Sequence, residues 1–77
     1  MEKFDRAIAN VLKELRENKK ISQEQLSFEA NLHRTYISQL ERGLKSVTVK
    51  TLAKITNVLQ IDIDIFIKKV MNELEKL

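Results

Sequence analysis

Residues 21–43, which read ISQEQLSFEANLHRTYISQLERG, contain the signals that decide the fold. Ser22 can cap a helix, and Gln25 three residues later completes a capping box with it. Asn31 tolerates the left-handed conformation that ends a helix better than most residues do. A short helix is therefore predicted between these two signals. The apolar residues that it would bury are Leu26 and Ala30.

A second helix is predicted from about Arg34 to Arg42. It ends at Gly43, the only glycine of the chain, where a C-cap favours that residue. A turn of about three residues joins the two helices, which is the arrangement of a helix-turn-helix motif. Phe28 in the first helix is expected to pack on the helix that precedes the motif, with an exposed residue that binds a partner as the alternative. His33 is expected to be a cap or a surface residue.

Helical patterns flank this motif on both sides. Apolar residues recur with helical spacing from Phe4 to Leu15, which predicts a helix over about Phe4 to Lys19. Thr48 is predicted to cap a fourth helix. The inner face of that helix is predicted to hold Val49, Leu52, Ile55 and Leu59.

Residues 61–67 fit two different structures. The strict alternation of isoleucines in IDIDIFI is typical of a strand, which would pair with the same segment of a second copy. A helical stripe runs through the same residues to Leu77, and Asp62 can cap it. The helix is favoured because a lone strand has no partner in this chain. The predicted fold class is therefore all-α, with five helices in one domain (residues 1–77). Residues 68–77 are predicted to be a C-terminal helical extension that serves dimerisation.

The composition of the chain excludes several kinds of functional site and several classes of protein. The 77 residues lack cysteine, which excludes disulfides and thiolate metal sites, and His33 as the single histidine excludes a multi-histidine site. No apolar run reaches the length of a membrane span. Residues 1–20 carry charges throughout, so they contain no visible secretory signal. A cytoplasmic protein without membrane contact, metal or cofactor is expected. The net charge of +3 permits nucleic-acid binding without demanding it.

Catalysis is not expected. The chain has no paired carboxylates in an apolar setting, no nucleophile with a histidine partner and no glycine-rich phosphate loop. Asp62 and Asp64 lie at a predicted helix start, where capping explains them better than metal binding.

The helix predicted from residue 34 has two different faces. With Arg34 at zero and about 100 degrees per residue, the apolar side lies at about 200–300 degrees and the polar side at about 0–140 degrees. The apolar side consists of Tyr36, Ile37 and Leu40, and the polar side of Arg34, Thr35, Ser38, Gln39 and Arg42. An ordinary solvated face would mix in Glu and Lys, whereas Arg, Thr, Ser and Gln are the groups that read base edges. An ordinary polar surface helix is the alternative interpretation.

The quoted stretch resembles the phage repressor and Cro-like helix-turn-helix family. Three elements carry the resemblance in combination: Ser-Gln-x-x-Leu at 22–26, Tyr-Ile-Ser-x-Leu-Glu-Arg-Gly at 36–43 and Thr-x-x-Thr-Leu at 48–52. Within that family the chain is similar to the controller proteins of restriction–modification systems, which are equally short. The resemblance covers about residues 16–66. It departs from the family at Asn31, where Gly is usual, and at Val47, where Pro is common.

The resemblance implies that the helix from Arg34 lies in the major groove of DNA. Arg34 is then the best base reader, because its guanidinium can donate twice to guanine O6 and N7, with a phosphate contact as the alternative. The implied base-reading residues are Arg34, Thr35, Ser38 and Gln39. The implied DNA-backbone contacts are Gln23, Tyr36, Arg42, Lys45, Ser46 and Thr48. Arg16 and Glu41 are implied to form a structural ion pair.

A two-fold dimer is expected, because the recognition helix of one chain reads only a few base pairs. The last apolar stripe offers a surface for it. The predicted interface residues are Ile61, Ile63, Phe66, Ile67 and Val70. In the alternative packing, the last helix folds back on Phe4 and Ile8 and buries the same stripe within one chain.

The expected function is that of a regulator which binds palindromic operators in double-stranded DNA as a homodimer. A controller protein would act on its own gene and on the endonuclease gene, activating at low concentration and repressing at high concentration. Activation would use contact between RNA polymerase and the acidic residues Glu24 and Glu29. The alternative function is that of an antitoxin, in which the stripe from Val70 to Leu77 would bind a partner toxin.

Overall fold

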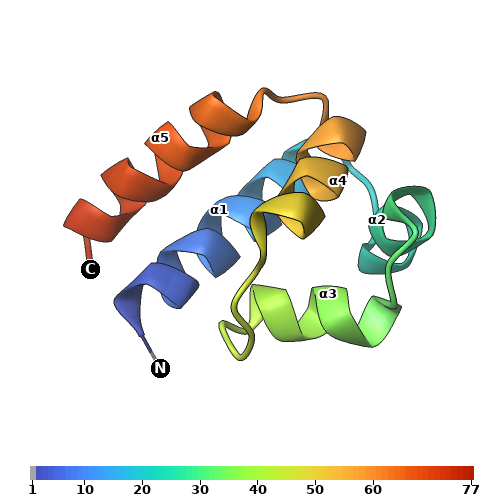
Figure 1. Ribbon diagram of the computed structural model, residues 1–77, viewed down its shortest axis with the longest axis horizontal. Coiled ribbons are helices and arrows are strands. Elements are labelled where there is room, and N and C mark those ends of the chain that lie inside the picture. The colour runs from blue at the N-terminus through green and yellow to red at the C-terminus, as the bar shows by residue number, and fades with distance from the viewer. Residues whose placement is uncertain (1) are drawn as a thin grey trace.

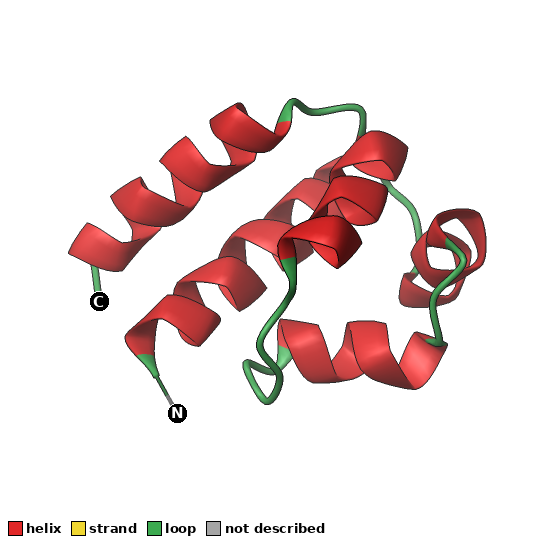
Figure 2. Cartoon of the chain, viewed as in Figure 1, coloured by secondary structure: helices red, strands yellow, loops and turns green. Residues whose placement is uncertain are grey.

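The computed structural model describes residues 2–77, which form five helices (Figure 1). The helices are α1 (Lys3–Asn18), α2 (Gln23–Ala30), α3 (Arg34–Glu41), α4 (Val49–Leu59) and α5 (Ile63–Glu75). Loops connect them, and residues 2–77 contain no strand (Figure 2). The all-α prediction is confirmed, and the strand alternative for the isoleucine segment is wrong. None of the helices in residues 2–77 has the length and hydropathy that a bilayer crossing requires.

The ends of the short helices follow the local signals. Ser22 Oγ accepts a hydrogen bond from the backbone N–H of Gln25 at 2.9 Å, and Thr48 Oγ1 accepts one from Thr51 at 3.1 Å. Asn31 adopts the left-handed conformation (φ 57°, ψ 48°) and ends α2. Each capping bond satisfies one backbone donor that the first turn leaves without a helical partner.

Two capping predictions need correction. The side chain of Gln25 does not return to Ser22, because its Nε2 donates to Glu29 Oε2 at 2.8 Å, one turn further along the helix. Asp62 occupies the N-cap position of α5, but its side chain makes no capping hydrogen bond. These side chains are solvent-exposed, so neither difference changes a helix boundary.

The core forms around α1, which packs against both α3 and α5. Figure 1 shows α5 alongside α1 and running in the opposite direction. Each helix contributes apolar side chains to one cluster. Its members are Ala7, Ile8, Val11, Leu12, Leu26, Ile37, Leu40, Leu52, Ile55, Leu59, Phe66 and Val70.

Two apolar residues predicted to be inside lie outside. Phe28 is 84% exposed and does not pack on α1, because it projects from the side of α2 opposite Leu26 and Ala30. Val49 is 76% exposed, although Leu52, Ile55 and Leu59 further along α4 are buried. Neither residue contributes to the core.

The last helix folds back on its own chain. Phe66 and Val70 are completely buried in the core next to α1. The prediction that these two residues form a dimer interface is therefore wrong for this packing, and the fold-back alternative is the observed one. Of the predicted interface residues, Ile61 and Ile63 stay half-buried and Ile67 is 37% exposed.

Candidate nucleic-acid interface

Helix α3 is anchored by one face and open on the other. Ile37 and Leu40 are buried in the core, and Tyr36 is half-buried against it. This anchoring turns the opposite side of the helix toward solvent. Arg34 and Thr35 are exposed there, whereas Ser38 and Gln39 are half-exposed. The four predicted base-reading residues thus lie together on the side of α3 that faces away from the core.

A buried ion pair ties α3 to α1, as the family resemblance implied. Arg16 Nε donates to Glu41 Oε2 at 2.6 Å and Arg16 Nη2 donates to Glu41 Oε1 at 3.0 Å. Only 11% of the arginine side chain and 3% of the glutamate side chain are exposed. Arg16 Nη1 also donates to the carbonyl of Ile21 at 2.7 Å, which fastens the loop before α2. The paired geometry is bidentate, which is the strongest form of this interaction.

The hydrogen bond to Glu41 raises the pKa of the Arg16 guanidinium above the ordinary value of an arginine, while burial opposes the shift. Because the pKa is higher in the folded than in the unfolded chain, this contribution to stability is fully present below the ordinary pKa of arginine. It is lost only as the pH rises through the raised pKa of the folded chain. The ion pair therefore stays intact on the arginine side throughout the neutral range.

Gln23 extends this network to the start of α2. Its Nε2 donates to Glu41 Oε1 at 3.0 Å, so Glu41 holds side chains from both α1 and α2. This contact could not be predicted from the sequence, because the two residues lie 18 positions apart and no local pattern links them. The contact turns the one carboxylate of α3 inward, so the outer face of the helix carries none.

A polar hollow of about 250 Å³ connects the beginnings of α2 and α3. It is lined by Gln23, Arg34, Thr35 and Ser38. All four side chains can donate hydrogen bonds, and none of them is acidic. Such a lining favours an anionic or acceptor-rich partner over a cationic one.

The loop of residues 42–48 continues this surface beyond α3. Arg42 and Lys45 are exposed cations in it. Two predicted backbone contacts of this loop have side-chain partners within the chain: the Ser46 hydroxyl donates to Asp5, and Thr48 Oγ1 caps α4. The six predicted DNA-backbone residues therefore lie at the start of α2, on α3 and in this loop.

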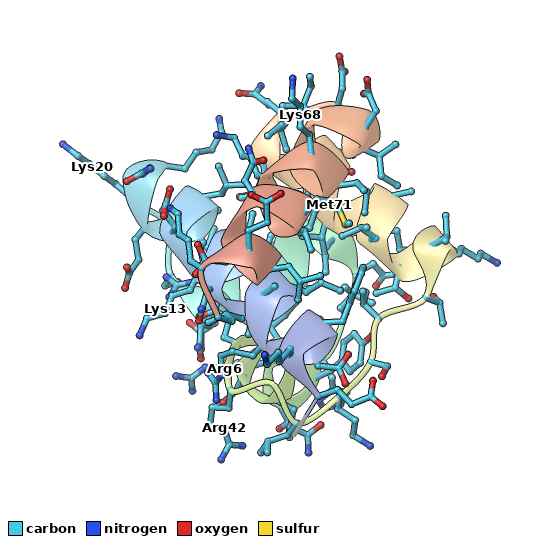
Figure 3. The ribbon with its side chains drawn as sticks, turned by 90° about the vertical axis from the view of Figure 1, so that its left-hand side faces the viewer. Arg6, Lys13, Lys20, Arg42, Lys68 and Met71 are labelled. Atoms are coloured by element: carbon cyan, nitrogen blue, oxygen red, sulfur yellow. The ribbon has the colours of Figure 1, made fainter. Side chains whose placement is uncertain are left out.

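Residues of α1 that the sequence analysis did not select hold this loop. Arg6 Nη2 donates to the carbonyl of Arg42 at 3.3 Å, and the Ser46 hydroxyl lies 3.2 Å from both carboxylate oxygens of Asp5. Figure 3 shows Arg6 and Arg42 at the same end of the molecule. These contacts span 36 and 41 residues of sequence, so no helical or turn pattern could reveal them.

Comparison with known proteins identifies the family. A helix-turn-helix family model matches residues 12–66. The crystal structure of the wild-type restriction–modification controller protein C.Esp1396I superposes with a TM-score of 0.88 and 31% sequence identity, covering 96% of this chain and 95% of that one. The chain belongs to the helix-turn-helix controller proteins. The resemblance drawn from the three sequence elements is confirmed.

One further relative and a second structure of C.Esp1396I are informative. Control protein C.BamHI of Bacillus amyloliquefaciens is 51% identical over 39 residues, so the match spans about half of each chain (51% of this one and 48% of that one). The C.Esp1396I tetramer in complex with its natural 35 base-pair operator has a TM-score of 0.88 and 31% identity over 96% of this chain and 97% of that one. In that structure the relative is bound to DNA.

Proposed function

We propose that this controller protein is a sequence-specific transcriptional regulator that binds palindromic operators as a homodimer and controls a restriction–modification operon. It activates at low concentration and represses at high concentration. Operator DNA is its partner, no cofactor takes part, and no catalytic group is needed. Because the operators lie in genomic DNA, we propose that this activity takes place in the cytoplasm.

One observation carries the proposal. The outer face of α3 presents Arg34, Thr35, Ser38 and Gln39, while its single carboxylate, Glu41, is buried against Arg16. Base edges in the major groove are read by hydrogen-bonding side chains of these types. A carboxylate on the same face would repel the phosphates on either side of the groove. The arrangement therefore suits the major groove of double-stranded DNA.

The surrounding residues supply affinity without choosing sequence. Gln23 is held by Glu41 at the rim of the hollow, where its remaining amide hydrogen can meet a phosphate beside the start of α2. Arg42 and Lys45 are exposed in the loop that follows α3. Each phosphate contact made by such a cation releases counterions, so binding weakens as salt rises.

Replacing Arg34 by alanine tests the base-reading role. With a duplex selected from a random pool, Arg34→Ala is expected to lose about 1–3 kcal/mol of discrimination at one base pair in each half-site. The loss arises because a bidentate contact to guanine disappears. Binding to the selected duplex and to its single-base variants, followed by fluorescence anisotropy, measures the change.

Lys45→Ala is the matched control for this experiment. It is expected to weaken binding to all duplexes alike and to reduce the slope of log K against log salt by about 1. The base-reading role of Arg34 is contradicted if Arg34→Ala behaves in the same uniform way as Lys45→Ala.

The dimer is proposed to form through the outward side of α5. Ile63, Ile67 and Met71 recur every four residues and share one side of this helix. Ile67 is 37% exposed and Met71 is 47% exposed, whereas Phe66 and Val70 on the neighbouring side are buried. A second copy is the occupant that fits, because two-fold operators require two recognition helices. Figure 3 shows Met71 on the flank of α5 toward α4.

Replacing Met71 by lysine is expected to weaken dimerisation at least about tenfold, because each interface would have to bury an unpaired ammonium group. The helical circular dichroism should stay unchanged, since the residue lies outside the core. Sedimentation equilibrium measures the dissociation constant. Asn72→Lys adds the same charge to the next, exposed position and should leave the dimer intact. Equal dissociation constants for the two variants would place the interface elsewhere.

The antitoxin alternative is not favoured. The two similar solved structures described above are controller proteins. Each comparison covers 96% of this chain and 95–97% of the solved chain. The stripe that an antitoxin would offer to a toxin is also partly used inside the chain, because Val70 is buried and Leu74 packs against the core.

A further inference from the structure

The loop of residues 42–48 depends on α1 for its position. Its first part is bonded to the end of α3, through the N–H of Gly43 to Leu40 at 3.0 Å and the N–H of Leu44 to Gln39 at 2.9 Å. From Lys45 to Val47, no backbone N–H donates to a carbonyl among residues 2–77. Hydrogen bonding of this second part therefore rests on side chains.

Asp5 supplies that bond. The Ser46 hydroxyl is 3.2 Å from each of its carboxylate oxygens, so either oxygen can accept the single hydroxyl hydrogen. Arg6, the next residue of α1, donates to the carbonyl of Arg42 at the other end of the loop. The first turn of α1 thus holds the loop at Arg42 and at Ser46, and the exposed Lys45 lies between the two attachments.

Because Asp5 is negatively charged, the direction in which DNA affinity changes on its removal distinguishes two possible roles. A carboxylate next to a DNA-contacting loop repels phosphates, so removal of its charge alone should tighten DNA binding. If the carboxylate also positions the loop, removing it should weaken binding in spite of that repulsion. The two effects have opposite directions.

We propose that Asp5 is a positioning residue for operator binding, which acts by holding Ser46 and with it the loop that presents Arg42 and Lys45 to the DNA backbone. The inference rests on the proposed function. It assigns to the N-terminal turns of α1 a part in DNA binding although they lie outside the helix-turn-helix motif. Asp5 acts through Ser46 and needs no contact with the DNA.

Binding of a labelled duplex that carries the selected operator tests this inference. Asp5→Ala and Ser46→Ala are each expected to weaken binding about three- to tenfold, the effect of one lost hydrogen bond. The double variant should be no weaker than either single variant, because both remove the same bond. Asp5→Asn should bind at least as tightly as wild type, since its amide oxygen still accepts from Ser46 and its charge is gone.

Two further measurements separate a positioning role of Asp5 from an effect on folding and from an effect of its charge. The slope of log K against log salt should fall by about 1 for Asp5→Ala, as a phosphate contact is lost with the loop, and return to the wild-type value for Asp5→Asn. Thermal unfolding gives the temperature range in which every variant is folded, and binding is measured there. Glu14→Ala removes an exposed carboxylate of α1 away from the loop and should not weaken binding.

Failure of the proposed function and failure of this inference alone give different experimental results. If the wild-type chain selects no sequence, the proposed function fails and this inference fails with it. If the wild-type chain binds its operator but Asp5→Ala binds equally or more tightly, Asp5 acts only as a charge and the inference alone is overturned. Additive losses in the double variant would overturn it as well.

Discussion

Replacing Phe66 by alanine is expected to destabilise the chain by about 3–5 kcal/mol, the usual cost of deleting a buried phenyl ring. Phe66 is completely buried and belongs to the single core cluster. A chain of 77 residues has only about 4–12 kcal/mol of total stability. The variant should therefore lose a large part of its stability, and urea denaturation followed by circular dichroism measures the loss.

The matched comparison is Met71→Ala on the same helix. Met71 is 47% exposed, so its truncation should leave the circular dichroism of the folded chain unchanged and act on dimerisation instead. The two variants thus separate the inner side of α5 from its outer side. If Phe66→Ala dissociates the dimer but keeps the unfolding free energy of wild type, the fold-back packing of α5 on α1 is incorrect.

Replacing Glu41 by alanine is expected to cost a similar amount, about 3–5 kcal/mol, because the buried Arg16 charge loses its partner. Only 11% of the Arg16 side chain is exposed, so water replaces the lost hydrogen bonds poorly. Gln23 loses its acceptor in the same variant. The free energy of unfolding in urea at neutral pH measures the effect.

Controls for this prediction lie close by. Glu17 is 57% exposed and 4.0 Å from Arg16, so Glu17→Ala should change stability by less than about 0.5 kcal/mol. The double variant Arg16→Met, Glu41→Leu should be more stable than Glu41→Ala, since it leaves no unpaired buried charge. A loss below about 1 kcal/mol in Glu41→Ala would show that the pair does not join α1 to α3 energetically.

Local chemistry predicted where the helices begin and end. Ser22 and Thr48 cap their helices through their hydroxyls, and Asn31 and Gly43 take the positive φ that their positions require. The left-handed conformations of Lys20 and Gln60 could not be predicted. Neither residue type favours this conformation, which costs about 1–2 kcal/mol, so the packing of the adjoining helices must impose it.

Side-chain direction was harder to predict than helix position. The angular position of Phe28 on α2, opposite Leu26 and Ala30, indicates an exposed residue, but its aromatic character suggested a buried one. Angular position is the better signal in a helix this short. In α5 both packings use the same stripe, so periodicity could not show whether Phe66 and Val70 meet their own α1 or a second copy.

The candidate site likewise contains features that could be predicted from the sequence and contacts that could not. The face of α3 follows from its helical period, and the roles of Gln23 and Lys45 were inferred by resemblance. The supporting contacts of the site, Gln23 to Glu41 and Ser46 to Asp5, join distant segments. Only the folded chain reveals such contacts, because nothing in the intervening sequence records them.

Selection from a random pool of DNA duplexes tests the central claim most directly. The purified protein is incubated with the pool at roughly physiological salt, and the bound fraction is recovered and sequenced. Salt near this level suppresses binding that depends on phosphate contacts alone. We expect enrichment of a two-fold symmetric motif whose half-sites lie about one helical turn apart. Recovery of an unenriched pool, or binding that simply disappears as salt rises, would contradict it.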